Sequence, residues 1–221
     1  INILNQIDII KHVNFNLGCP SSRVQENMLG LALTQNYDLV KKCLFELINY
    51  KHEVSVKCRL GLGMNEDKNY IFSYLNLFKD IGIKKVFIHC RNGVLNLDTK
   101  KNRTIPQINY ELFLECSKKF PEMELIPNGE VNDLETFNSF KSKNINKYMI
   151  GRQVAKDALF LEKLKLEKIN DKTSLVLDSI KELDNYKYLN INLLKKSLFT
   201  LINNISHSKG IKKDISIIDN T

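Results

Sequence analysis

The stretch V-S-V-K-C-R-L-G at residues 54–61 decides the fold that we expect for this chain. It is rich in β-branched residues and ends in a glycine, which is typical of a buried strand before a turn. A helical pattern precedes it at 37–50, and another follows at 69–81 and ends at Gly82. A strand between two helical patterns predicts βαβ units, in which helices join parallel strands.

Four further strand patterns surround this stretch. They lie at 12–17, 85–90, 123–127 and 147–150, with helical patterns at 110–120 and 133–143. Polar side chains follow the strands at their ends, which is the edge where α/β folds bind ligands. They are Asn16, Lys57, Arg59, His89, Arg91, Asn128 and Arg152. Five strands are fewer than the eight that close a (β/α)8 barrel.

After Arg152 the strand patterns stop. Residues 174–183 and 190–205 have helical patterns, and the second carries an apolar stripe at i, i+3 and i+7 spacing. We therefore expect an α/β domain over residues 1–160 and a helical region over 161–221. The alternative is that the C-terminal helices only cover the sheet.

The composition is that of a globular protein, with 43% hydrophobic and 26% charged residues among 221. No apolar run is long enough to cross a bilayer. The net charge of +8 favours polyanionic partners, and basic residues cluster at 100–103 and between 187 and 213. A solvated basic surface is the alternative.

The five cysteines are an odd number without C-x-x-C spacing. This argues against a disulfide framework or a zinc site and favours a reducing compartment. The cysteines at 43, 58, 90 and 116 lie in apolar segments and are expected to be buried. Cys19 differs, because it lies in a turn between Gly18 and Pro20.

The run N-F-N-L-G-C-P-S-S-R-V-Q at 14–25 resembles the signature of the tRNA-dihydrouridine synthases, flavoenzymes with a TIM barrel. The resemblance continues in order through V-K-C-R-L-G at 56–61, I-H-C-R-N at 88–92 and T-K-K-N-R-T-I-P at 99–106. It ends with N-G-E-V at 128–131 and M-I-G-R at 149–152. It covers about residues 10–160, and its K-x-N-R-x-I-P block resembles the bacterial A-type branch.

The resemblance implies an enzyme that reduces the C5–C6 bond of uridine in tRNA, with FMN as cofactor and NADPH as reductant. Reduced FMN would pass a hydride to C6, and Cys19 would protonate C5 as a general acid. A buried structural cysteine is the alternative reading of the same residue.

The resemblance also assigns the remaining site residues. Those expected to bind the cofactor are Lys57, His89, Asn128, Gly129, Glu130, Gly151 and Arg152. Those expected to contact the substrate or tRNA, whose target base must be flipped out of its stack, are Asn16, Lys100 and Arg103. Residue type alone gives other interpretations. Asn16 would then form a turn, and His89 would be a core histidine whose hydrogen bonds are satisfied. The segment 100–103 would be a solvated loop.

The chain departs from the family in two ways. Glu130 stands where family members usually carry a second glycine, and a carboxylate beside a phosphate is repulsive unless it points away. The family's first three strands are not matched, so we expect an N-terminally truncated, incomplete TIM barrel made of strands 4–8. We expect these 221 residues alone to bind FMN poorly or not at all.

Two other hypotheses stay open at this point. One is another FMN barrel, such as a dihydroorotate dehydrogenase, which the basic block and the basic C-terminal region argue against. The other is a non-catalytic tRNA-binding remnant, which Glu130 and the unmatched strands favour and Cys19 and Lys57 oppose. For the leading hypothesis we expect a monomer in the cytoplasm or an organelle, without metal or membrane contact.

Overall fold

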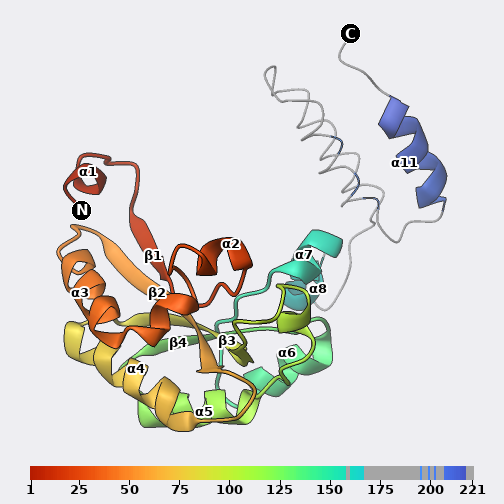
Figure 1. The fold of residues 1–221 in the computed structure, drawn as a ribbon. Coiled ribbons are helices and arrows are strands. Elements are labelled where there is room, and N and C mark those ends of the chain that lie inside the picture. Colours follow the sequence, from red (N-terminus) through yellow and green to blue (C-terminus); the bar gives the residue numbers. More distant parts are fainter. Residues whose placement is uncertain (158–159, 167–194, 196–198, 200–201, 203–206, 218–221) are drawn as a thin grey trace. The chain divides into compact units, whose positions relative to one another are not determined.

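The computed structural model describes residues 1–157, 160–166, 195, 199, 202 and 207–217. Four parallel strands form one sheet in the order β1-β2-β3-β4 (Figure 1). They are β1 (His12–Asn16), β2 (Glu53–Leu62), β3 (Lys85–Gly93) and β4 (Glu124–Asn128). The predicted α/β fold with a parallel sheet is therefore confirmed, and the sheet is consistent with part of a barrel.

Three helices connect the strands and lie together on one side of the sheet (Figure 1). They are α3 (Tyr37–Leu47), α4 (Lys68–Ile81) and α5 (Tyr110–Lys119). Each begins after an Asn or Asp, at 36, 67 and 109, whose side chain accepts a hydrogen bond from a first-turn N–H group. At its other end, α4 stops at Gly82, where φ is +94°, as the sequence predicts.

The side of the sheet that faces these helices is apolar. Val56 of β2 and Ile88 of β3 are fully buried, and they are register partners of Phe15 and Cys58. Phe78 of α4 is also fully buried, as is the corresponding apolar stripe of α5. Complete burial of a side chain of this size stabilises the fold by about 2–3 kcal/mol, so this layer is the core.

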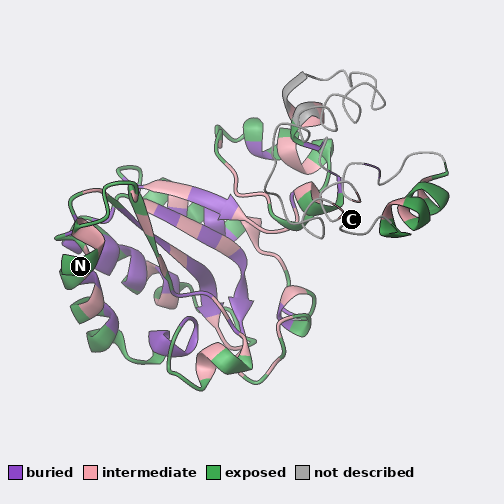
Figure 2. Ribbon diagram, turned by 90° about the horizontal axis from the view of Figure 1, so that it is seen from above, coloured by how far each residue is buried: buried purple, intermediate pink, exposed green. Residues whose placement is uncertain are grey.

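The opposite side of the sheet is polar. Asn16 pairs with Lys57 across β1 and β2, and Arg59, His89 and Asn128 share one row across β2, β3 and β4. Register partners in parallel strands point to the same face. Figure 2 shows β2 and β3 as mostly buried strands that carry some intermediate residues, whereas β1 is exposed or intermediate along its length. Five of the polar residues singled out by the sequence therefore stand on one face.

The prediction of a fifth strand at 147–150 is wrong, because this segment forms a single bridge, between Met149 and Asn128. The physical reason lies at the end of β4. Gly129 and Glu130 have φ values of +121° and +49°, so the backbone leaves the extended conformation directly after Asn128. Pairing therefore cannot continue past Asn128, and before it Pro127 has no N–H group to donate to a neighbouring strand.

The remaining helices are short. The predicted helix at 133–143 is present as α6 (Leu134–Lys141), capped by Asp133, whose carboxylate accepts from the N–H of Thr136 at 2.7 Å. The others are α1 (Asn2–Asn5), α2 (Ser22–Gln25), η1 (Ala32–Gln35), η2 (Lys101–Arg103), α7 (Arg152–Lys156), α8 (Phe160–Leu166) and α11 (Ser208–Ile217). The helical pattern at 174–183 lies outside the described residues, as does that at 190–205 apart from residues 195, 199 and 202.

The chain divides into two compact units. The first comprises Ile1–Glu130 and Asn146–Met149, and it contains the whole sheet. The second comprises Val131–Ile145 and Ile150–Thr221. The expected domain boundary after residue 160 stays a prediction. Among the described residues, no helix is long and apolar enough to span a membrane, and no group of His, Cys, Asp or Glu is arranged to hold a metal ion.

All five cysteines are free thiols. Those of Cys58, Cys90 and Cys116 are buried, as expected, but Cys43 is only half-buried. Cys43 flanks the stripe of α3 whose buried residues are Val40 and Leu44, so it lies at the border of the core.

Candidate functional site

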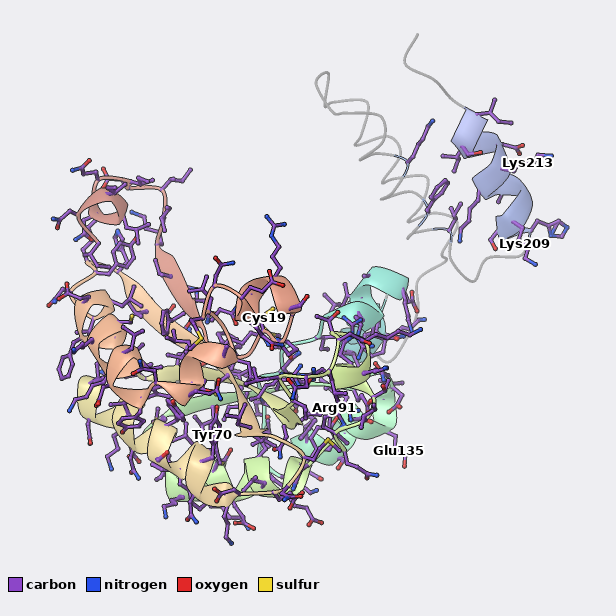
Figure 3. All side chains as sticks on the ribbon, in the orientation of Figure 1. Cys19, Tyr70, Arg91, Glu135, Lys209 and Lys213 are labelled. Atoms are coloured by element: carbon purple, nitrogen blue, oxygen red, sulfur yellow. The ribbon has the colours of Figure 1, made fainter. Side chains whose placement is uncertain are left out.

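The loop that carries Cys19 follows β1 at the carboxyl end of the sheet (Figure 3). The side-chain oxygen of Asn16 accepts from the N–H groups of Gly18 and Cys19 at 3.1 and 3.2 Å. The carbonyl of Cys19 accepts from the N–H of Leu31 at 3.0 Å, and a Cβ on Gly30 would lie only 2.7 Å from that carbonyl. The backbone around the thiol is therefore held on both sides.

This geometry gives Asn16 a local task. Its oxygen shapes the turn before Cys19, as the residue type alone predicts. The thiol of Cys19 is half-buried and donates to the hydroxyl of Ser21 at 3.6 Å. The contact of Asn16 with a substrate stays a prediction.

Two cations of β2 lie within electrostatic range of the Cys19 thiol, namely Lys57 and Arg59. Burial lowers the pKa of Lys57 below its ordinary value, and burial lowers that of Arg59 to about 10. Within the described part of the chain, the ammonium group of Lys57 makes no hydrogen bond or ion pair. A half-buried ammonium group without a partner is a group that an anionic ligand would stabilise.

Arg59 is satisfied by backbone carbonyls. Its Nε donates to Gly18 at 2.9 Å, and one terminal nitrogen donates to Asn92 at 2.8 Å and to Asn102 at 3.2 Å. The sequence places Arg59 among the polar residues at strand ends but does not predict this role.

The loop after β3 carries the basic residues predicted to contact tRNA, and one buried side chain organises it. Asn102 is fully buried; its amide nitrogen donates to the carbonyls of Val94 and Leu97 at 2.8 Å each. Its oxygen accepts from the N–H of Val94 at 2.8 Å. Lys100 is exposed and Arg103 is half-buried, so both are available at the edge of the loop. The asparagine inside the K-x-N-R block is the sequence signal for this arrangement.

Glu130 lies beside a buried cation. Its carboxylate forms an ion pair with the guanidinium of Arg91, which also donates to the carbonyl of Pro106. The register between β2 and β3 shifts near this point, because Arg59 pairs with His89 whereas Gly61 pairs with Asn92. This bulge lies next to Arg91, and such irregularities re-aim side chains. The charge of Glu130 is therefore balanced within the chain.

His89 lies against the loop after β4. A Cβ on Gly129 would meet the His89 ring at 2.9 Å, so glycine is needed for this approach. The amide of Asn128 donates to the carbonyl of Met149 at 2.8 Å. Gly151 precedes α7, and Arg152 is its exposed first residue. Because these two residues belong to the second compact unit, their expected place beside Gly129 stays a prediction.

The structure thus brings polar residues from three strand ends to one edge. Cys19, Lys57 and Arg59 are electrostatically coupled there, and Arg59 also reaches the basic loop. The sequence does not predict the roles of Arg59 and Asn102, because both depend on which backbone carbonyls the folded loops bring within reach.

A parallel α/β sheet with charged side chains at its carboxyl edge defines an enzyme-like binding site. The family model described as "Dihydrouridine synthase (Dus)" matches residues 4–217. The chain belongs to the dihydrouridine synthase family.

Curated relatives carry the name tRNA-dihydrouridine(20/20a) synthase. The relative from Pseudomonas aeruginosa is 31% identical over 143 residues, which are 64% of this chain and 43% of that protein. The relative from Yersinia pestis is 29% identical over 175 residues, which are 78% of this chain and 50% of that protein. The chain therefore spans about half the length of the curated relatives that it matches, or less.

Proposed function

We propose that this chain forms part of an FMN-dependent tRNA-dihydrouridine synthase, in which Cys19 donates the proton that completes reduction of a uridine. The observation that carries the proposal is a half-buried thiol, on a backbone held at both sides, within electrostatic range of Lys57 and Arg59. Family membership supports the reaction class. The four strands would be part of a TIM barrel.

The described residues fit a flavin phosphate and ring. Arg91 has a buried Nε without a hydrogen-bond partner, and Lys57 has no anionic partner in the described part of the chain. We propose that Lys57, His89 and the loop 128–130 hold the cofactor. The resemblance to the family assigns Gly151 and Arg152 to cofactor binding as well. FMN, when bound and reduced, supplies the hydride, and NADPH is the proposed reductant.

The chain's own contribution to the chemistry is the proton and its placement. The turn built by Asn16 fixes the backbone of Cys19, and a thiol held in that way can protonate C5 of the reduced base as a general acid. Lys57 and Arg59 lie within electrostatic range of this thiol.

The substrate proposed is a uridine in tRNA. Lys100 and Arg103 stand on a loop whose backbone Asn102 holds rigid, and their charges match a phosphate backbone. The K-x-N-R block and the names of the relatives support the A-type branch of the family.

The test is dihydrouridine formation in unmodified tRNA by the protein expressed from its own gene. Cys19→Ala should lower the rate by at least about 100-fold, because general acid catalysis contributes about that much. The affinity for tRNA should stay within about twofold. Cys43→Ala serves as the matched control, because Cys43 is a half-buried thiol on α3.

Two outcomes would contradict the proposal. If Cys19→Ala reduces uridine at the original rate, Cys19 is not the proton donor. If tRNA is bound but the unsubstituted protein forms no dihydrouridine under reducing conditions with FMN, the alternative of a non-catalytic tRNA-binding remnant is correct.

A further inference from the structure

One guanidinium contacts both loops of the proposed site. We call residues 17–21 the thiol loop and residues 94–106 the basic loop. Arg59 is 4% exposed, and it donates to Gly18 of the thiol loop at 2.9 Å and to Asn102 of the basic loop at 3.2 Å. Gly18 is next to Cys19, and Asn102 is next to Arg103. Arg59 is therefore a shared contact of the two segments that carry the proposed proton donor and the proposed tRNA contacts.

The acceptors require the shape of an arginine. Its partners are three backbone carbonyls from separate segments, the third being that of Asn92 at 2.8 Å. A guanidinium presents donors in a planar fork, whereas a lysine ammonium places its donors on one nitrogen. A lysine at position 59 would keep the charge but could not reach both loops at once.

Burying the Arg59 guanidinium also costs stability, which is a reason to look for a role beyond stabilising the fold. Taking a guanidinium out of water with only neutral carbonyl partners is unfavourable, and the lowered pKa of Arg59 reflects that desolvation. Gly93 leaves room for Arg59 and for Leu31, because a Cβ there would lie 2.8 Å from the Arg59 side chain and 2.3 Å from that of Leu31. The fold therefore tolerates the cost of a buried guanidinium at the point where the two loops meet.

We propose that Arg59 is a positioning residue, which fixes the Cys19 thiol relative to Lys100 and Arg103 by holding both loops on one guanidinium. The proposal rests on the proposed function of Cys19 as proton donor. A uridine whose backbone is held by the basic loop then meets the thiol at a set position. In this proposal Arg59 acts on the reaction through these two loops, and the lysine variant keeps its positive charge near the thiol.

The first measurement is dihydrouridine formation by the protein expressed from its own gene, with kcat and KM for tRNA determined separately. Arg59→Lys should lower kcat by about 10- to 100-fold, as a misplaced catalytic group does, and change KM by less than about threefold. In the Cys19→Ala background, Arg59→Lys should cause no further loss, because there is no thiol left to position. Equal losses in both backgrounds would overturn the proposal, as would an unchanged kcat in the single variant.

The second measurement is amide hydrogen exchange, which needs no activity. The reporters are the N–H of Leu31, which donates to Cys19, and the N–H of Val94, which donates to Asn102. Arg59→Lys should speed exchange at both by at least about tenfold while the α4 amides stay protected. Loss of protection at only one loop, or at neither, would overturn the proposal.

Tyr74→Phe is the matched control for both measurements, because it removes a buried hydrogen bond to a carbonyl, that of Thr34 at 2.6 Å. It should leave kcat and both reporter amides unchanged. If the unsubstituted protein reduces no uridine, the proposed function fails, and the exchange experiment still decides whether Arg59 joins the two loops.

Discussion

Glu130 stands at a position where glycine is expected, and it combines a backbone conformation that suits glycine with an ion pair that glycine cannot form. Its φ of +49° is a conformation that glycine adopts freely and that costs other residues about 1–2 kcal/mol. Its carboxylate meets Arg91, a guanidinium that is 4% exposed. The expected repulsion between Glu130 and a bound phosphate is therefore reduced, because the carboxylate already has a cationic partner.

Two substitutions separate strain from charge at this position. Glu130→Gln keeps the strained backbone and removes the charge, so it should lower the free energy of unfolding by about 2 kcal/mol, since it leaves a buried charge without its partner. Glu130→Gly loses the same charge but relieves the backbone, so it should cost about 1 kcal/mol less than Gln. Urea unfolding measures both values.

The control for this pair is Glu46→Gln, an exposed carboxylate on α3, which should change stability by less than about 0.5 kcal/mol. A glycine variant that is no more stable than the glutamine variant would show that position 130 carries no strain.

At the scale of elements, the strands and the helices between them could be predicted because each buries one regular apolar face. The β2 segment and the helices on either side follow the expected ranges within three residues. The segment 147–150 has the same apolar character, yet Pro127 before the bridge and the left-handed backbone at 129 and 130 after it limit pairing there to one bridge. The φ value of a neighbouring residue cannot be predicted from the apolar pattern of a segment.

The short helices and the site contacts could not be predicted for a different reason. α2 has no buried residue and α1 has none, so neither has an apolar stripe to detect. Two of the carbonyls that accept from Arg59 lie 41 and 43 residues away in the sequence. Whether an arginine contacts such carbonyls or solvent depends on how the loops fold, and the local sequence does not contain that information. Strand ends reveal which residues are polar, but not which backbone groups they bind.

Gly30 and Gly82 form a matched pair for a test of the turns. Both have positive φ, +58° and +94°, but a Cβ at Gly82 has open space whereas one at Gly30 would lie 2.7 Å from the Cys19 carbonyl. Gly82→Ala should therefore cost about 1 kcal/mol, for the backbone alone. Gly30→Ala should cost at least about 2 kcal/mol more, because it adds a backbone clash. Urea unfolding of the two variants measures the difference.

The same pair tests how the thiol loop is held. Alkylation of Cys19, followed by mass spectrometry of its peptide, should be faster in Gly30→Ala and unchanged in Gly82→Ala, since only Gly30 packs on that loop. Equal destabilisation and equal alkylation rates in both variants would show that the contact with Cys19 is unimportant.

At the scale of the whole molecule, the buried thiols make the free energy of unfolding depend on pH. Burial raises the pKa of Cys58 and of Cys116 to about 12 from an ordinary value of 9.0, and it raises the pKa of Cys90 as well. Burial also raises the pKa of Tyr74 to about 12. Lys57 acts in the opposite sense, because its lowered pKa favours the folded state as the pH rises.

The sign of the pH dependence follows from these directions. Above pH 9.0 the unfolded chain loses its thiol protons, whereas the folded chain keeps those of Cys58 and Cys116 up to about pH 12. The folded state then binds more protons, so the free energy of unfolding falls by about 1.4 kcal/mol per pH unit for each such group. Three thiols outweigh Lys57, and stability should drop by about 3 kcal/mol between about pH 8 and pH 10.

Urea unfolding at several pH values in that range checks the expectation, with reductant present to keep the thiols free. Cys116→Ala should be less stable at neutral pH, because it leaves a cavity, but should show a shallower decline by about 1.4 kcal/mol per pH unit. A stability that stays level up to pH 10, or an equal slope in Cys116→Ala, would mean that these thiols are not protected in the folded core. If the pH dependence of the free energy of unfolding scales with the number of buried thiols, the apolar layer beneath the candidate site excludes solvent in the folded state.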